Sequence, residues 1–134
     1  MQEMQIDPNT GFLDRYSCLR LTAELVNTAG TSEKPLAVLW IDIDRFKQIN
    51  ESFGYDGGDS IISVIAGRLA EKIKGTSKIG RISADEFIYL APDVDLENAE
   101  KLGLELMQII EAPVSLGDFH VRLTASIGIA DKAR

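Results

Sequence analysis

Cysteine and histidine are nearly absent from this sequence of 134 residues, which has Cys18 and His120 as its only examples. One cysteine cannot form an intramolecular disulfide, so a disulfide scaffold is excluded and a reducing, cytoplasmic compartment is expected. One histidine leaves no second imidazole for a histidine-based metal site. The longest apolar run, residues 36–41, is too short to cross a membrane, and the polar N-terminal segment has no signal-peptide character. We therefore expect no membrane contact by this chain, although a longer parent protein is free to carry an anchor.

Positive charge is also scarce, because 14 lysine and arginine residues stand against 21 aspartate and glutamate residues, giving a formal net charge of −7. Such a surface repels polyanions over a wide area, so nucleic acid is not expected as a partner. A small anionic ligand is compatible with this charge where a metal ion bridges it to carboxylates. A hydrophobic content of 45% with 26% charged residues is typical of a soluble globular domain.

Apolar spacing and turn residues predict a mixture of helices and strands. The apolar run 36–41 predicts a strand buried on both faces, and Asp59 is expected to cap the N-terminus of a long helix. In chain order we expect a helix over 13–28, a strand over 36–41, a short helix over 46–53 that stops at Gly54, a long helix from 57, strands over 78–82 and 87–90, a helix over 95–111 and a strand over 121–129. This order favours an α+β fold (an α/β sandwich), a ferredoxin-like or nucleotidyl-cyclase palm whose central mixed, mostly antiparallel sheet is flanked by helices.

Acidic residues follow the predicted buried strand and form the turn of a predicted hairpin. Asp42 and Asp44 are two residues apart at a strand end, so both side chains point to the same face. Hard oxygen ligands suit Mg²⁺, which takes one or two protein carboxylates and completes its shell with water and phosphate. Asp85 and Glu86 complete such a site if strand 87–90 lies beside strand 36–41. The alternative is a solvated strand end and a soluble acidic turn.

Four segments, in order along nearly the whole chain, resemble one known family. Residues 42–59, DIDRFKQINESFGYDGGD, resemble the D-x-D-x-F-K-x-x-N-D-x-x-G-H-x-x-G-D stretch of GGDEF domains, the diguanylate cyclases. Residues 7–15 (DPNTGFLDR) are similar to the family's D-P-L-T-G-L-P-N-R, and residues 81–87 (RISADEF) align with R-x-G-G-D-E-F. Residues 124–130 match its late T-A-S-I-G-I-A strand.

The resemblance implies a reaction and a set of metal-binding residues. Members of the family join two GTP molecules into cyclic di-GMP and release pyrophosphate, and two domains meet face to face with one GTP each, so catalysis needs a homodimer. By resemblance, Asp42, Asp85 and the carbonyl of Ile43 would hold Mg²⁺ (or Mn²⁺). Glu86 would be a further acidic ligand or a proton acceptor, which makes Asp85 and Glu86 the candidate catalytic residues.

The resemblance also implies substrate-binding residues. Asn50 and Asp59 match positions that bind the guanine, and Phe46 and Lys47 match the segment around the phosphates. The pair Ser83-Ala84 matches the signature glycines beside the nucleotide. Each residue also has a purely structural interpretation. Asp59 is then a helix cap, Phe46 a core residue and Asn50 the end of a helical turn.

Departures from the family pattern indicate a degenerate signature, Ser83-Ala84-Asp85-Glu86-Phe87. Glycine allows positive φ in a tight hairpin, whereas a Cβ in the left-handed region costs roughly 1–2 kcal/mol and here projects a methyl group toward the nucleotide. Tyr55 replaces the usual histidine. The inhibitory pattern R-x-x-D aligns with residues 74–77, KGTS, so feedback binding of cyclic di-GMP there is not expected.

We therefore expect residues 1–134 to be a single GGDEF domain, excised from a larger multidomain protein before the family's C-terminal helix. The favoured function is cyclic di-GMP signalling with GTP–Mg²⁺ binding and weak or no cyclase activity. Two alternatives stay open, and with them the question of whether the chain is an enzyme. One is an active diguanylate cyclase, and the other is a nucleotide-free regulatory module for an adjoining EAL phosphodiesterase domain. Sensor domains are also expected as fused partners.

Overall fold

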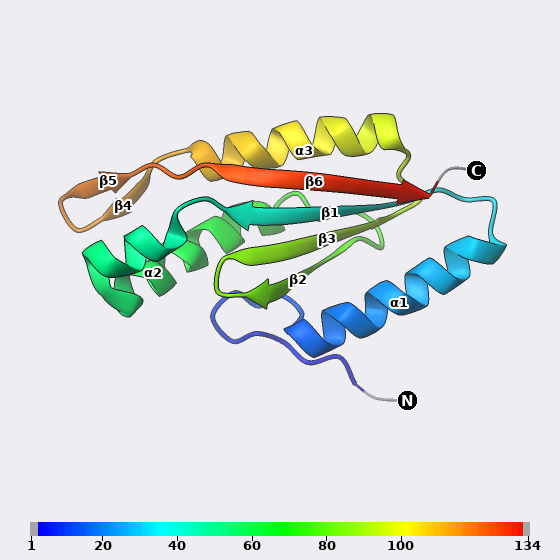
Figure 1. Cartoon of the computed structure of the whole chain (residues 1–134), viewed down its shortest axis with the longest axis horizontal. Helices are drawn as coiled ribbons and strands as arrows, with labels where there is room; N and C mark the ends of the chain where they lie inside the picture. Colours follow the sequence, from blue (N-terminus) through cyan, green and yellow to red (C-terminus); the bar gives the residue numbers. More distant parts are fainter. Residues whose placement is uncertain (1–2, 133–134) are drawn as a thin grey trace.

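The structure is a computed structural model that describes residues 3–132, and its helices and strands are shown in Figure 1. In chain order they are α1 (Arg15–Thr31), β1 (Leu36–Ile43), α2 (Phe46–Ala70), β2 (Lys78–Ser83), β3 (Glu86–Pro92), α3 (Leu96–Glu111), β4 (Val114–Leu116), β5 (Phe119–Val121) and β6 (Ala125–Lys132). No helix in this part of the chain is both long enough and apolar enough to cross a membrane.

The main sheet has the strand order β2-β3-β1-β6, and all of its ladders are antiparallel. Helices α2 and α3 pack on one face of the sheet, where Leu39, Ile41 and Ile43 contribute to the larger core. Helix α1 packs on the opposite face over β2 and β3, with Cys18 fully buried against Ile88. The expected α+β architecture with a mostly antiparallel sheet flanked by helices is confirmed.

Strand β1 is not buried on both faces along its whole length. The α1 side of the sheet is left open beside β6, and Trp40 is 42% exposed there. The expectation of full burial was wrong because an uninterrupted apolar run carries no alternation to mark the open face. Trp40 consequently stands at the edge of the same surface as Asp42.

Helix α2 contains a kink at Gly54, which has φ 76° and ψ 170°. Positive φ is the left-handed region that glycine adopts without penalty, so the chain breaks the helix and resumes it at once. The predicted stop at Gly54 is confirmed. The prediction of an N-cap at Asp59 was wrong, because the second half of α2 begins immediately after Gly54 and Asp59 lies inside it.

Strands β4 and β5 form a separate two-stranded hairpin that the sequence pattern did not reveal. The predicted strand 121–129 is divided between β5 and β6, with residues 122–124 outside both. Gly117, at φ 59°, lies in the turn of this hairpin. Residues 122–124 consequently run past the N-terminal part of α2, where they line a cavity.

Candidate functional site

The carboxylates predicted to converge are brought together by the pairing of β1 with β3. Asp42 is directly opposite Glu86 in the ladder, and the backbone N–H of Ile43 donates to the carbonyl oxygen of Asp85 at 2.9 Å. The prediction that strand 87–90 lies beside strand 36–41 is confirmed. Asp42, Asp85 and Glu86 therefore share the end of the sheet that leads into α2.

Electrostatic repulsion within this acidic group is visible at Asp42. Burial raises the pKa of Asp42, and the nearby charges of Asp85, Glu86 and Asp44 raise it further. Within residues 3–132 no three histidine, cysteine, aspartate or glutamate side chains are grouped as a ready-made metal cage. Mg²⁺ needs only one or two protein carboxylates, so this donor set fits a cation that completes its shell with water and phosphate oxygens.

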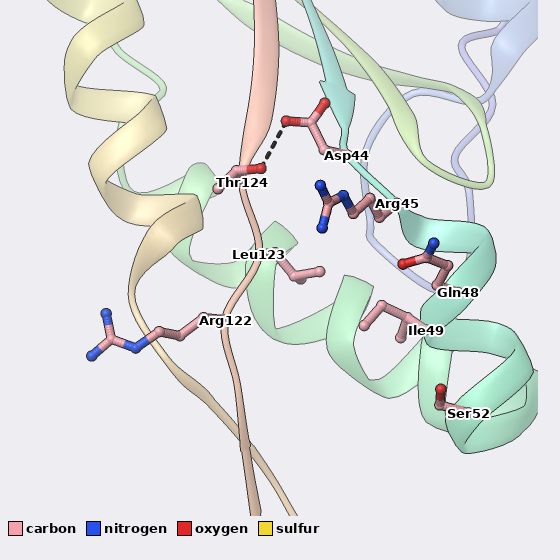
Figure 2. Close-up of a pocket in the computed structure, with 8 residues that line it drawn as sticks. All are labelled: Asp44, Arg45, Gln48, Ile49, Ser52, Arg122, Leu123 and Thr124. Atoms are coloured by element: carbon pink, nitrogen blue, oxygen red, sulfur yellow. Dashed lines mark hydrogen bonds between the residues drawn. The ribbon is translucent and has the colours of Figure 1, made fainter.

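Asp44 has a different role from that of Asp42. Its carboxylate accepts hydrogen bonds from the hydroxyls of Thr124, at 2.8 Å, and Ser126, at 2.9 Å. Figure 2 shows the Thr124 contact, and the backbone N–H of Asp44 also donates to the Thr124 carbonyl at 2.9 Å. Asp44 thus fastens the end of β1 to β6, and its two oxygens are already hydrogen-bonded.

Glu86 is held by two side chains of its own sheet. Its Oε2 accepts from the indole Nε1–H of Trp40 at 3.1 Å, and its Oε1 accepts from the Ser83 hydroxyl at 2.8 Å. The same hydroxyl lies 3.2 Å from Oδ1 of Asp85. Ser83 therefore touches both carboxylates of the turn.

The β2–β3 turn forms without glycine. Arg45 and Asp93 are the non-glycine residues of the described chain with positive φ, so Ser83 and Ala84 avoid the left-handed region. The expectation of backbone strain at these two residues was wrong. A register shift between Arg81 and Ser83 shapes the hairpin, and the Arg81 guanidinium donates to the carbonyls of Ser83, at 3.2 Å, and Ala84, at 2.9 Å.

A cavity of about 420 Å³ adjoins the acidic group and collects most of the predicted substrate-binding residues. It is lined by Phe46, Lys47, Asn50, Glu51, Tyr55, Ala84 and Asp85. Phe46 is buried in the larger core, as its structural interpretation predicts. Lys47 is exposed, and no ion pair joins it to another described residue.

Asp59 does not line this cavity, but its predicted partner Asn50 is close by. A Cβ at Gly58 would collide with the Asn50 carboxamide and would lie 3.1 Å from Cζ of Phe46. The missing side chain of Gly58 therefore lets the two halves of α2 approach each other. Asp59 follows Gly58 in the sequence and is thus one residue from the contact with Asn50. The Asp59 carbonyl accepts from the Asn9 amide at 3.3 Å.

A second cavity, of about 810 Å³, lies on the other side of the N-terminal part of α2 and was not predicted (Figure 2). It is lined by Asp44, Arg45, Gln48, Ile49, Ser52, Arg122, Leu123 and Thr124. Figure 2 shows the Arg45 side chain near Asp44 and Thr124, whereas Arg122 points away from the other lining residues. The sequence analysis expected one continuous strand over 121–129 and so missed the irregular segment 122–124 that lines this cavity. Recognising that segment was the one way to predict the cavity from the sequence.

The fold agrees with the comparisons to known proteins. The family model described as diguanylate cyclase, GGDEF domain, matches residues 4–133. The cyclic di-GMP phosphodiesterase NbdA of Pseudomonas aeruginosa is 30% identical over 129 residues, which cover 96% of this chain and 16% of NbdA. The diguanylate cyclase DgcP of the same organism is 30% identical over 133 residues, covering 96% of this chain and 19% of DgcP.

A solved structure shows the same fold. The crystal structure of a sensory box/GGDEF family protein from Caulobacter crescentus superposes with a TM-score of 0.83 at 31% identity, covering 94% of this chain and 82% of that one. This chain belongs to the GGDEF domain family of diguanylate cyclases. It spans less than a fifth of the length of NbdA and of DgcP, so the match concerns one domain of those proteins.

Proposed function

We propose that this domain binds GTP with Mg²⁺ (or Mn²⁺) and acts in cyclic di-GMP signalling with weak or no cyclase activity. The observation that carries the proposal is the position of Asp85. Its carboxylate belongs to the acidic group with Asp42, and the residue also lines the cavity that contains Lys47 and Asn50. A nucleotide in this cavity would therefore lie beside the cation-binding carboxylates.

Each proposed role is the one that the resemblance to GGDEF domains implies, and the chemistry of the residue is compatible with it. Asp42 and Asp85 hold the cation together with the Ile43 carbonyl, and Lys47 offsets phosphate charge. The resemblance assigns guanine recognition to Asn50 and Asp59, and an amide and a carboxylate can pair with the donor and acceptor edges of guanine. The cation, when bound, polarises phosphoryl oxygens and lowers the pKa of an attacking hydroxyl.

Low turnover follows from one feature of the turn. The methyl group of Ala84 occupies space in the cavity wall where glycine would leave room for a ligand. Turnover in this family also needs two domains in a homodimer, since each GTP attacks the other.

Two other functions compete with this proposal. An active diguanylate cyclase is favoured by the absence of positive φ at Ser83 and Ala84, because the turn forms without strain. A regulatory module for an adjoining EAL phosphodiesterase domain is favoured by the match to NbdA, whose name is that of a phosphodiesterase. In either case we expect fused sensor or EAL domains in a cytoplasmic part of the whole protein.

Calorimetric titration of GTP, with and without Mg²⁺, tests the proposed binding. We expect binding that depends on Mg²⁺ and is lost in Asp42→Ala. The matched control is Asp118→Ala, which removes an exposed carboxylate from the turn between β4 and β5. Failure of the unaltered chain to bind millimolar GTP would contradict the proposal, and pyrophosphate release at rates typical of cyclases would favour the active enzyme.

A further inference from the structure

Both carboxylate oxygens of Glu86 accept a hydrogen bond, and the two donors come from different strands. Trp40 belongs to β1 and donates its indole N–H to Oε2, whereas Ser83 ends β2 and donates its hydroxyl to Oε1. Two bonds to one carboxylate restrict its side-chain rotamer far more than either bond alone. Glu86 is therefore fixed in orientation beside Asp42 and Asp85.

The register of the sheet explains why these donors reach the same residue. Glu86 is directly opposite Asp42, and Trp40 precedes Asp42 by two residues on β1. Residues two apart on a strand share a face, so the indole lies diagonally across the ladder from Glu86. The open sheet face beside β6 leaves room for the indole, which is 42% exposed.

We propose that Trp40 and Ser83 are positioning residues that orient Glu86 toward a divalent cation held by Asp42 and Asp85. The inference rests on the proposed function. It gives Trp40 and Ser83 a role in orienting Glu86 that the family resemblance does not imply. Each carboxylate oxygen has two lone pairs, so one hydrogen bond per oxygen leaves the second lone pair free for a cation. The two donors thus orient Glu86 without blocking it.

Ser83 has a single hydroxyl proton to share between two carboxylates. Its oxygen is 2.8 Å from Glu86 and 3.2 Å from Asp85, so the shorter bond to Glu86 is the stronger one. Asp85 keeps its carboxylate available for the cation. The serine that replaces a signature glycine therefore supplies a hydrogen bond to the acidic group that glycine cannot make.

The contact can be tested without metal, because the chain has one tryptophan and therefore one indole N–H resonance. In NMR spectra of the unaltered chain with a chelator, we expect the proton chemical shift of this resonance to lie downfield, as is typical of a hydrogen-bonded indole N–H. Glu86→Ala and Ser83→Ala should move it upfield, whereas the control Ser115→Ala, at an exposed hydroxyl of β4, should leave it in place. An indole resonance that Glu86→Ala leaves unchanged would overturn the proposed contact.

The positioning role is tested by Mn²⁺ affinity, measured calorimetrically. We expect Trp40→Phe and Ser83→Ala each to weaken Mn²⁺ binding by about tenfold. This is the lower end of the range of affinity losses seen when a residue that orients a metal ligand is replaced. Ser83→Thr, which keeps the hydroxyl, should restore the affinity. In a Glu86→Ala background neither substitution should have a further effect, because both act through Glu86.

The outcomes separate this inference from the proposed function. Mn²⁺ binding that is equally strong in the unaltered chain, Trp40→Phe and Ser83→Ala would overturn the positioning role alone. Losses that persist unchanged in the Glu86→Ala background would also overturn it, since they would reflect a general structural effect. No Mn²⁺ binding by the unaltered chain would overturn the cation role of Glu86, whereas the GTP titration decides the proposed function and the NMR test decides whether the contact forms.

Discussion

The guanidinium of Arg81 lies 3.2 Å from the carboxylate of Asp7, although the two residues are far apart in the sequence. The same guanidinium donates to the carbonyls of Ser83 and Ala84. One side chain therefore joins the N-terminal segment to the turn that carries Asp85. A shift of residues 7–12 relative to the sheet would move the Arg81 guanidinium and so change its hydrogen bonds to this turn.

Replacement of Asp7 should reveal this connection through stability. Burial alone would raise the pKa of Asp7, but hydrogen bonds from Thr10 and Arg81 and the Arg81 charge lower it overall from 3.8. A lowered pKa in the folded state stabilises the protein above pH 3.8, and this stability is lost as the pH falls through the lowered pKa. We expect Asp7→Asn to cost about 1–2 kcal/mol at pH 7, measured by urea unfolding.

The pH dependence supplies the control for that prediction. The difference in unfolding free energy between Asp7→Asn and the unaltered chain should shrink in acid as Asp7 becomes protonated. Asp118→Asn, at an exposed turn, should behave like the unaltered chain throughout. A difference that stays constant from pH 7 down to pH 2 would show that the Asp7 charge is not responsible.

Asp42 should show the opposite relation between charge and stability. Its pKa is raised above 3.8 by burial and by Asp85, Glu86 and Asp44, so ionised Asp42 destabilises the folded state once the pH exceeds the ordinary value. We expect Asp42→Asn to raise the thermal midpoint at pH 7 in a chelator, and the gain to vanish below pH 3.8. Mn²⁺ should raise the midpoint of the unaltered chain and leave that of Asp42→Asn unchanged. A lower midpoint for Asp42→Asn without metal would contradict this account.

The glycines of α2 offer a matched pair for testing the kink. A Cβ at Gly54 or Gly67 would meet no atom within 4 Å, but only Gly54 has positive φ. Gly54→Ala should therefore destabilise the chain by about 1–2 kcal/mol because alanine is strained in that conformation. Gly67→Ala should stabilise it by about 0.5–1 kcal/mol because alanine favours a helix interior. Equal effects of the two substitutions on urea unfolding would mean that α2 is not kinked at Gly54.

The sequence predicted the acidic group only on the condition that strand 87–90 pairs with strand 36–41, and it was the resemblance to GGDEF domains that assigned Asp42 and Asp85 to one cation. The register that sets Asp42 opposite Glu86 depends on tertiary packing, however, and so does the open face at Trp40. Neither contact of Glu86 could be anticipated, because a serine in a turn and a tryptophan in an apolar run carry no signal that they share a partner.

The β4–β5 hairpin escaped prediction for a different reason. Its strands have three residues each, which is too short for apolar alternation to be recognised. Backbone strain was expected at Ser83 and Ala84 because the family has glycines at these positions. In this chain the turn is instead formed with a register shift and with hydrogen bonds from Arg81. The cavity beside Arg45 was missed together with the hairpin.

Ala84 is the residue whose replacement tests why the site would be degenerate. Its backbone does not need glycine, so Ala84→Gly removes only the methyl group from the cavity wall. We expect GTP affinity in the presence of Mg²⁺ to rise by about tenfold, in line with the effect of a single methyl group in a binding pocket. Ala130→Gly, at an exposed position of β6, should leave the affinity unchanged.

Comparison with Ser83→Gly makes the test of the turn complete. If the methyl group of Ala84 is the obstacle and Ser83 orients Glu86, Ala84→Gly should strengthen GTP binding while Ser83→Gly weakens the Mn²⁺ binding on which it depends. Calorimetry with each ligand distinguishes the two effects. If both glycine substitutions strengthen binding and raise pyrophosphate release, the Ser83 hydroxyl is an obstacle like the Ala84 methyl group. In that case the bond from Ser83 to Glu86 would compete with the cation for the carboxylate.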